Sequence, residues 1–330
     1  MKKNELCAGD VILFPPHKGD FIAQAIAFLT DGEVNHAALC YPENGVLMIA
    51  ESILKDGLVL NPFQEHIDGE YPLRVCRRKG QNDMKPVLFA ARKYLEEKNT
   101  YPNFNLGLLG VLLLFKKFAP HTWKNKVVYS FALLVASELM QLVRKHKYAD
   151  KHPMSCSQFV AQCFTDAGAG YDLNFETLVV DFEVVKKNAV MTRSQNNDEE
   201  ISPVEMLNKT ETSLKTAMHT FSDDKIGELK ISDQEKLALT SEFMKVTSNK
   251  IAVTRGVSST EETVSSSALK RVMANIAFAI YELQTGVFTT DLKKVLTYLK
   301  SSTARNFFVS PQDLLANCTD SLEHIGNLSY

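Results

Sequence analysis

Cys156 occupies a position where a cysteine side chain can serve as a nucleophile. Ser155 precedes it and Gln158 follows, and a serine three residues before a glutamine is the pattern of a helix capping box. With Ser155 as the N-cap, Cys156 is the first residue of a helix over residues 155–167. The free N–H groups and the positive dipole end at a helix start favour thiolate over thiol and lower the pKa of the sulfur. The spacing therefore predicts an activated thiol.

A structural role for Cys156 is the alternative, because free cysteines are most often buried and inert. Cys156 then forms the top of an apolar helix stripe that continues through Phe159, Val160, Cys163, Phe164 and Ala167. Cys40, Cys76 and Cys163 are expected in the core. None of the six cysteines forms a CxxC pair, and their wide scatter predicts reduced thiols, with neither a structural zinc site nor a disulfide framework.

A thiolate nucleophile needs a base and a group that orients the base, and His36 and Glu51 are the candidates. Two apolar, β-rich segments, 36–41 and 46–51, flank the tetrapeptide 42–45 (PENG). If these four residues form the hairpin loop, Tyr41 pairs with Val46 and His36 pairs with Glu51. Directly paired residues point to one face of a sheet, so the carboxylate can hold the imidazole. A pairing shift of one residue breaks this arrangement.

Short strands and helices must position these residues. The N-terminal part predicts strands at Val11–Phe14, His36–Tyr41, Val46–Glu51, Gly57–Leu60 and Leu73–Cys76, with a helix over 21–29 that Asp20 caps. A further helix begins near Asp83, with Pro86 in its first turn. Asp10 is interpreted as a turn residue before a strand. Five other histidines are interpreted as surface residues: His17, His66, His121, His146 and His152.

Composition and the distribution of apolar and polar segments along the chain predict an α+β protein of two parts. The 330 residues include 45% apolar and 23% charged residues, which is ordinary for a globular protein. We expect a catalytic domain over 1–193 with an apolar helical insertion at 104–150, a polar linker at 194–204, and an all-helical accessory region over 205–330. Within that region, a stripe from Leu269 to Leu283 predicts one helix, and two more helices are expected to follow.

Charge and motifs exclude several function classes. Lys plus Arg number 37 and Asp plus Glu 39, so the net charge of −2 does not support nucleic-acid binding. No GxxxxGK[ST] or GxGxxG loop occurs, and the sequence predicts neither a cofactor nor a metal site. No signal-peptide pattern or confident membrane span is visible, which predicts a cytoplasmic protein or one exported without a cleaved signal peptide.

The order of four segments resembles the circularly permuted NlpC-type papain-like cysteine hydrolases. These segments are Gly9–Phe14, Asn35–Leu39, Ala50–Ser52 and Ser155–Val160, and the nearest pattern is that of YiiX/YaeF-like proteins, related to the lecithin:retinol acyltransferase-like enzymes. The resemblance covers about residues 5–180 and implies a permuted papain-like domain, with a small antiparallel sheet packed on helices. It implies Cys156 as the nucleophile, His36 as the base and Glu51 as the orienting residue.

Three functions remain open from the sequence. The first is a cysteine amidase or peptidase that attacks a peptide-like amide through a thioester. The second is a fatty-acyl transferase, lipase or thioesterase, since the apolar segment 104–118 could line an acyl pocket or contact a membrane surface; it could equally be a buried helix. The third is a catalytically silent binding module. A peptide-like or acyl substrate is expected, and the partner of the C-terminal region is not identified by any motif.

Overall fold

A computed structural model describes most of the sheet and its covering helices. The described residues are 1–17, 32–53, 56–63, 72–80, 83–97, 154–175, 266–299 and 301–328, with Ala23, Ala27, Thr30 and Leu139 as single positions. The chain divides into two compact units: Met1–Asn105, Tyr148–Val180 and Thr297–Tyr330 form the first, and Leu106–Lys147 and Asp181–Leu296 the second. The expected helix over 21–29, the insertion at 104–150 and the linker at 194–204 lie almost wholly outside the described residues.

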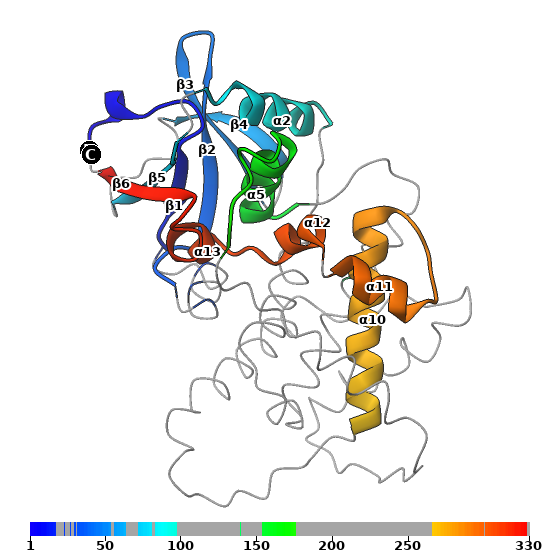
Figure 1. Ribbon diagram of the computed structural model, residues 1–330. Coiled ribbons are helices and arrows are strands. Elements are labelled where there is room, and N and C mark those ends of the chain that lie inside the picture. The colour runs from blue at the N-terminus through cyan, green and yellow to red at the C-terminus, as the bar shows by residue number, and fades with distance from the viewer. Residues whose placement is uncertain are drawn as a thin grey trace, which may run out of the picture. The chain divides into compact units, whose positions relative to one another are not determined.

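A six-stranded antiparallel sheet forms the framework of the first unit (Figure 1). The strands are β1 Val11–Phe14, β2 His36–Glu43, β3 Val46–Ile53, β4 Gly57–Pro62, β5 Leu73–Arg78 and β6 Leu322–Leu328. Their order across the sheet is β4-β3-β2-β1-β5-β6, with every neighbouring pair antiparallel. The five strands predicted from the N-terminal sequence are confirmed, and so is the α+β class.

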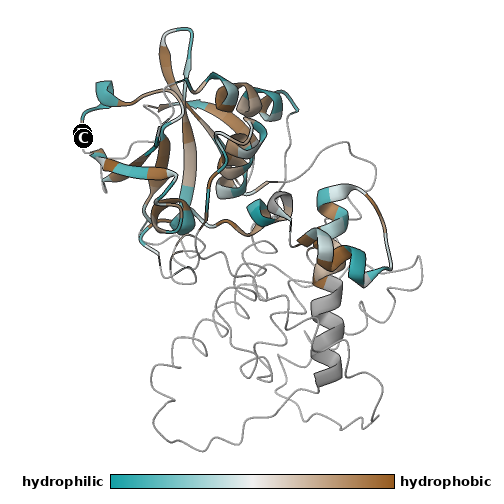
Figure 2. Ribbon diagram, in the orientation of Figure 1, coloured by the Kyte–Doolittle hydropathy of each residue, from teal (hydrophilic) through white to brown (hydrophobic). Residues whose placement is uncertain are grey.

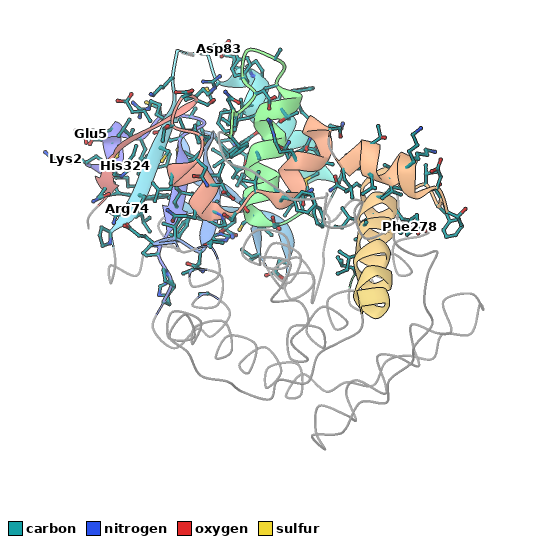
Figure 3. All side chains as sticks on the ribbon, turned by 60° about the horizontal axis from the view of Figure 1, so that its bottom comes forward. Lys2, Glu5, Arg74, Asp83, Phe278 and His324 are labelled. Atoms are coloured by element: carbon teal, nitrogen blue, oxygen red, sulfur yellow. The ribbon has the colours of Figure 1, made fainter. Side chains whose placement is uncertain are left out.

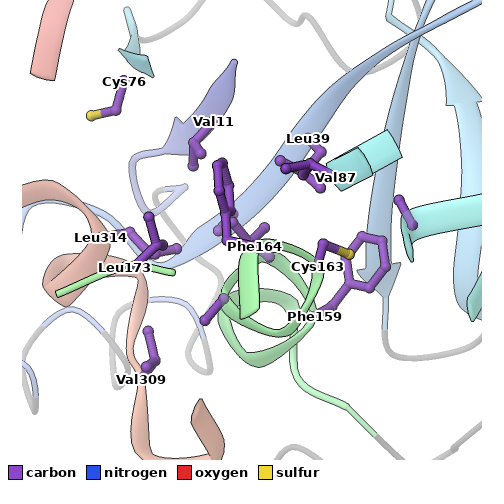
Figure 4. Packing of buried hydrophobic residues seen from close by; sticks show 14 of the residues in the cluster. Val11, Leu39, Cys76, Val87, Phe159, Cys163, Phe164, Leu173, Val309 and Leu314 are labelled. Carbon is purple, nitrogen blue, oxygen red and sulfur yellow. The ribbon is translucent and has the colours of Figure 1, made fainter. Parts of the chain in front are cut away.

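Alternation along the strands divides the apolar residues between the two faces of the sheet. Val11, Leu13 and Leu39 belong to the core cluster that includes helices α2 (Lys85–Glu96) and α5 (Cys156–Asp166). Figure 4 shows Phe164 of α5 directed toward Val11 of β1. The intervening strand residues, among them Ile12, Phe14, Ala38 and Cys40, form a second cluster on the opposite face. Figure 2 shows the resulting apolar character of β1 and β2.

The β2–β3 hairpin has a two-residue turn, and this corrects the predicted register. Glu43 pairs with Val46 and Ala38 pairs with Glu51, so His36 is not directly opposite Glu51. Asn44 and Gly45 have φ values of 52° and 78°, which is the conformation of a type I′ turn and favours Asn-Gly. The predicted pairing was wrong by two residues. Because side chains alternate with a period of two, His36 and Glu51 still share one face.

The C-terminal residues return to the sheet, which corrects the expectation of an all-helical region over 205–330. Short helices α12 (Ser302–Arg305), η5 (Asn306–Phe308) and α13 (Pro311–Ala316) lead into β6, which pairs with β5. The ammonium group of Met1 donates to the Asn327 carbonyl at 2.7 Å. Figure 3 shows Lys2, Glu5 and His324 on this edge, where the 3-10 helix η1 (Lys3–Glu5) lies near β6.

Helix α10 (Ser266–Thr285) confirms the long helix predicted from the apolar stripe. Ile276, Ala277, Ile280 and Leu283, all on that stripe, are buried. Helix α11 (Leu292–Leu299) follows. In the part of the chain that the structure describes, no helix combines the length and the hydropathy needed to cross a membrane.

Candidate active site

Cys156 is the first residue of α5, as the sequence predicts, and Ser155 caps the helix. The Ser155 hydroxyl accepts a hydrogen bond from the backbone N–H of Gln158 at 3.1 Å. The reciprocal half of the predicted capping box is not formed, because Gln158 Oε1 is buried with no hydrogen-bond partner. The cap alone therefore fixes where the helix begins, and it places the thiol beside the free N–H groups of the first turn.

His36 and Glu51 form a short hydrogen bond. His36 Nε2 lies 2.6 Å from Glu51 Oε2, and Glu51 is only 1% exposed while the His36 side chain is 23% exposed. Glu51 directly opposes Ala38, so His36 is its diagonal neighbour on the same face. The bond uses Nε2 and leaves Nδ1 of the imidazole for a second partner.

The second partner of His36 is the thiol of Cys156. Burial by itself raises the pKa of the Cys156 thiol, but the charge of His36 and its hydrogen bond to the sulfur lower it, as do the backbone N–H groups of Ala37 and Ser157. The net effect is a pKa below the ordinary value of 9.0. Burial lowers the pKa of His36, yet the charge and hydrogen bond of Cys156, followed by those of Glu51, raise it to about 10. The directions of the two shifts both favour the thiolate–imidazolium form of the pair.

The contact between α5 and the sheet is made at the first residues of β2. Pairing between β2 and β3 begins at Ala38 opposite Glu51, so Ala37 lies just beyond that ladder. The Ala37 N–H can therefore donate to the sulfur at the start of α5. The Ser52 hydroxyl of β3 donates to the Met154 carbonyl at 2.7 Å and ties the segment before α5 to the sheet.

Other cysteines in the sheet and in α5 lie in a different electrostatic environment. Burial is the main cause that raises the pKa of Cys40 and of Cys76 to about 12, and nearby Asp10 adds to it. Burial also raises the pKa of Cys163 well above its ordinary value. These three residues pack in the core, as expected. A lowered thiol pKa therefore distinguishes Cys156 from three otherwise comparable cysteines.

Asp10 has a structural role at the turn before β1, where the sequence predicts a turn residue. Its carboxylate accepts two hydrogen bonds from Arg77, at 2.7 and 2.8 Å, and one from the backbone N–H of Cys7 at 2.7 Å. It is 1% exposed. The acceptor bonds hold the turn before β1 and link it to β5.

Asn61 is the site residue that sequence reasoning did not identify. It lies on β4, and its side-chain Nδ2 donates to Glu51 Oε1 at 3.0 Å. The sequence gives only a weak signal for this role of Asn61, because a single asparagine before Pro62, at the end of a predicted strand, is typical of a turn. Phe14 is a second neighbour: its ring centroid lies 5.3 Å from that of His36, and the two residues pair across β1 and β2.

No group of three or more His, Cys, Asp or Glu side chains gathers as metal ligands would within the described ranges. The single carboxylate of the site, Glu51, bonds to the His36 imidazole on one oxygen and to the Asn61 amide on the other. Chemically, this arrangement favours an ionised thiol next to a protonated imidazole.

Comparison with known proteins gives only weak structural likeness. No family model matches the chain, and no curated protein matches it. The crystal structure of metalloprotein YiiX from Escherichia coli O157:H7 is similar with a TM-score of 0.32 and 14% sequence identity, over 53% of this chain and 74% of that chain. YiiX-like proteins are also those that the sequence motifs resemble. At this level of likeness, the chemistry of the site rests on its own geometry.

Proposed function

We propose that the protein is a papain-like cysteine hydrolase that cleaves an amide bond of a peptide-like substrate through a thioester. The observation that carries the proposal is the series Cys156–His36–Glu51, in which the thiol pKa is lowered, the imidazole pKa is raised and the carboxylate is buried against the imidazole. Nucleophile, base and orienting group are the three parts that this chemistry requires.

The first half of the proposed reaction forms the thioester. The Cys156 thiolate attacks the carbonyl carbon and makes the C–S bond, while the carbonyl oxygen becomes an oxyanion. Backbone N–H groups at the start of α5, which have no partner within the helix, would stabilise that oxyanion. As the C–N bond breaks, His36 gives its proton to the leaving amine.

The second half releases the acid. His36, now neutral, takes a proton from water as the water oxygen attacks the thioester carbonyl. The C–S bond breaks, the carboxylic acid leaves, and the site returns to thiolate and imidazolium. Glu51 stays ionised throughout, and its hydrogen bond keeps the imidazole in one orientation.

Selective labelling tests the proposed nucleophile. Iodoacetamide at about pH 6 reacts only with thiols that are ionised there, so wild-type protein should gain one adduct on Cys156. Cys156→Ala should gain none, and Cys7→Ala, which removes an exposed cysteine, should label as wild type does. If Cys156 labels no faster than Cys40 or Cys163, the proposal is wrong.

Intact-mass detection of a covalent intermediate tests the substrate class. The full chain is exposed briefly to a set of peptide amides and, separately, to fatty-acyl esters and thioesters. An adduct on Cys156 with the acyl part of a peptide supports the amidase. A fatty-acyl adduct alone would replace it with acyl hydrolysis or transfer, and the absence of both in a chain that labels with iodoacetamide contradicts the hydrolase.

A further inference from the structure

Asn61 contacts the buried carboxylate on the side away from His36. Oε2 of Glu51 bonds to His36 Nε2 at 2.6 Å, and Oε1 accepts from Asn61 Nδ2 at 3.0 Å. We propose that Asn61 is a positioning residue, whose amide holds the Glu51 carboxylate against His36. This inference rests on the proposed hydrolase function, because it assigns a task only if the imidazole acts in the reaction.

The strand register explains why Asn61 can reach Glu51. Glu51 of β3 directly opposes Val59 of β4 and Ala38 of β2. His36 lies two residues before Ala38 on β2, and Asn61 lies two residues after Val59 on β4. Both are therefore diagonal neighbours of Glu51 on the same face, on opposite sides of it along the strand direction. Three adjacent strands thus contribute one residue each to a single hydrogen-bonded row.

Burial gives this row its energetic importance. Glu51 is 1% exposed, and an ionised carboxylate removed from water needs donors on its oxygens. The Asn61 amide donates without adding charge, which stabilises the anion and leaves its charge to support the His36 imidazolium. It also limits rotation of the carboxylate, so that Oε2 stays directed at Nε2.

Loss of the amide should weaken the whole row. Without the Asn61 donor, the Glu51 carboxylate is held less firmly against His36, and the imidazolium loses part of its support. The thiolate of Cys156 is stabilised mainly by that imidazolium. Removal of Asn61 should therefore shift the ionisation of the Cys156 thiol indirectly, through Glu51 and His36.

The test compares the pH dependence of iodoacetamide alkylation at Cys156 in full-length proteins. Asn61→Leu keeps the side-chain size but cannot donate. We expect its alkylation midpoint to move upward toward the ordinary thiol value of 9.0, and labelling at about pH 6 to slow by about tenfold, the lower end of what loss of an orienting partner costs. If Asn61→Leu fails to fold, Asn61→Ala gives the same readout without adding bulk.

Asn306→Leu is the matched control. Asn306 is also a buried asparagine, and its amide donates to Gln162 and Thr165 near the other end of α5. This change should lower the melting temperature and leave the alkylation midpoint where it is in wild type. A midpoint that does not move in either Asn61 variant, while wild type labels at low pH, overturns the inference and leaves the hydrolase intact. A wild type that does not label at low pH removes both.

Discussion

Cys156 and His36 titrate as a pair, and each residue depends on the other for its charge. The stability that His36 gains on folding is complete below its ordinary pKa of 6.5 and is lost as the pH rises toward about 10. The contribution of the Cys156 thiolate has the opposite sense: it is present above 9.0 and is lost as the pH falls through the lowered thiol pKa. Between the lowered thiol pKa and the raised His36 pKa of about 10, both groups are charged, and their attraction stabilises the fold.

Removing the thiol should therefore change the imidazole. In Cys156→Ala, the two largest causes that raise the His36 pKa are gone, while burial still lowers it and Glu51 still raises it. We expect the His36 pKa to fall below about 10, measured by NMR titration of the imidazole protons. A His36 pKa that stays near 10 would show that Glu51 alone sets it.

Gln158 supplies a second prediction at the residue scale. Its Oε1 atom is buried without a hydrogen-bond partner, and an unsatisfied buried acceptor costs about 1–3 kcal/mol. Gln158→Met keeps the length of the side chain and removes the acceptor, so the free energy of unfolding should rise by about 1 kcal/mol. Urea denaturation measures it, and Gln162→Met, on the partly exposed side of α5, is the comparison. A loss of stability at Gln158 contradicts this reasoning.

At the scale of elements, the β2–β3 turn fixes which residues share a face. Asn44 and Gly45 both adopt positive φ, and a Cβ at Gly45 would meet no atom within 4 Å. Gly45→Ala therefore adds backbone strain without a clash, and we expect it to lower the free energy of unfolding by about 1 kcal/mol. Asn44→Gly, which suits the same φ, should change it by less than about 0.5 kcal/mol. Equal stability of Gly45→Ala and wild type in urea would contradict the type I′ turn.

Helix α5 joins the site to the rest of the first unit through several polar contacts. Ser52 binds the Met154 carbonyl before the helix, and the buried Ser157 hydroxyl donates to the Val309 carbonyl at 2.7 Å. Val309 belongs to the C-terminal segment that leads into β6. The position of the thiol is thus determined by strands near the N-terminus and by a loop near the C-terminus together.

At the scale of the whole molecule, the stability of the first unit should depend on β6, the strand that the C-terminal residues add to the sheet. Truncation after Ala316 removes β6, including buried Leu322 and Leu328. Burial of each leucine is worth about 1.5–3 kcal/mol, so the loss is a large part of the 5–15 kcal/mol that stabilises a typical domain. We expect the truncated chain to lose cooperative thermal unfolding. Removal of Ser329 and Tyr330 alone is the control for length, and a truncated chain that melts as wild type does would show that β6 is dispensable.

The sequence by itself determined the local features. Five strands, the start of α5 at Cys156 and the Ser155 cap follow from alternation, turn residues and capping, which act over a few residues. His36 and Glu51 were placed on one face even with the wrong register, because an error of two residues preserves alternation. The Asn-Gly dipeptide was the missed signal for the two-residue turn.

Only the tertiary structure decided the contacts between distant segments. The ladder of β6 with β5, the bond of Asn61 to Glu51 and the approach of the Cys156 thiol to His36 join residues that no local pattern relates. Such contacts are selected by packing of the complete core, where many weak interactions act together. For the same reason the lowered pKa of Cys156 belongs to the folded unit, since the helix start supplies N–H groups but the imidazolium comes from another part of the chain.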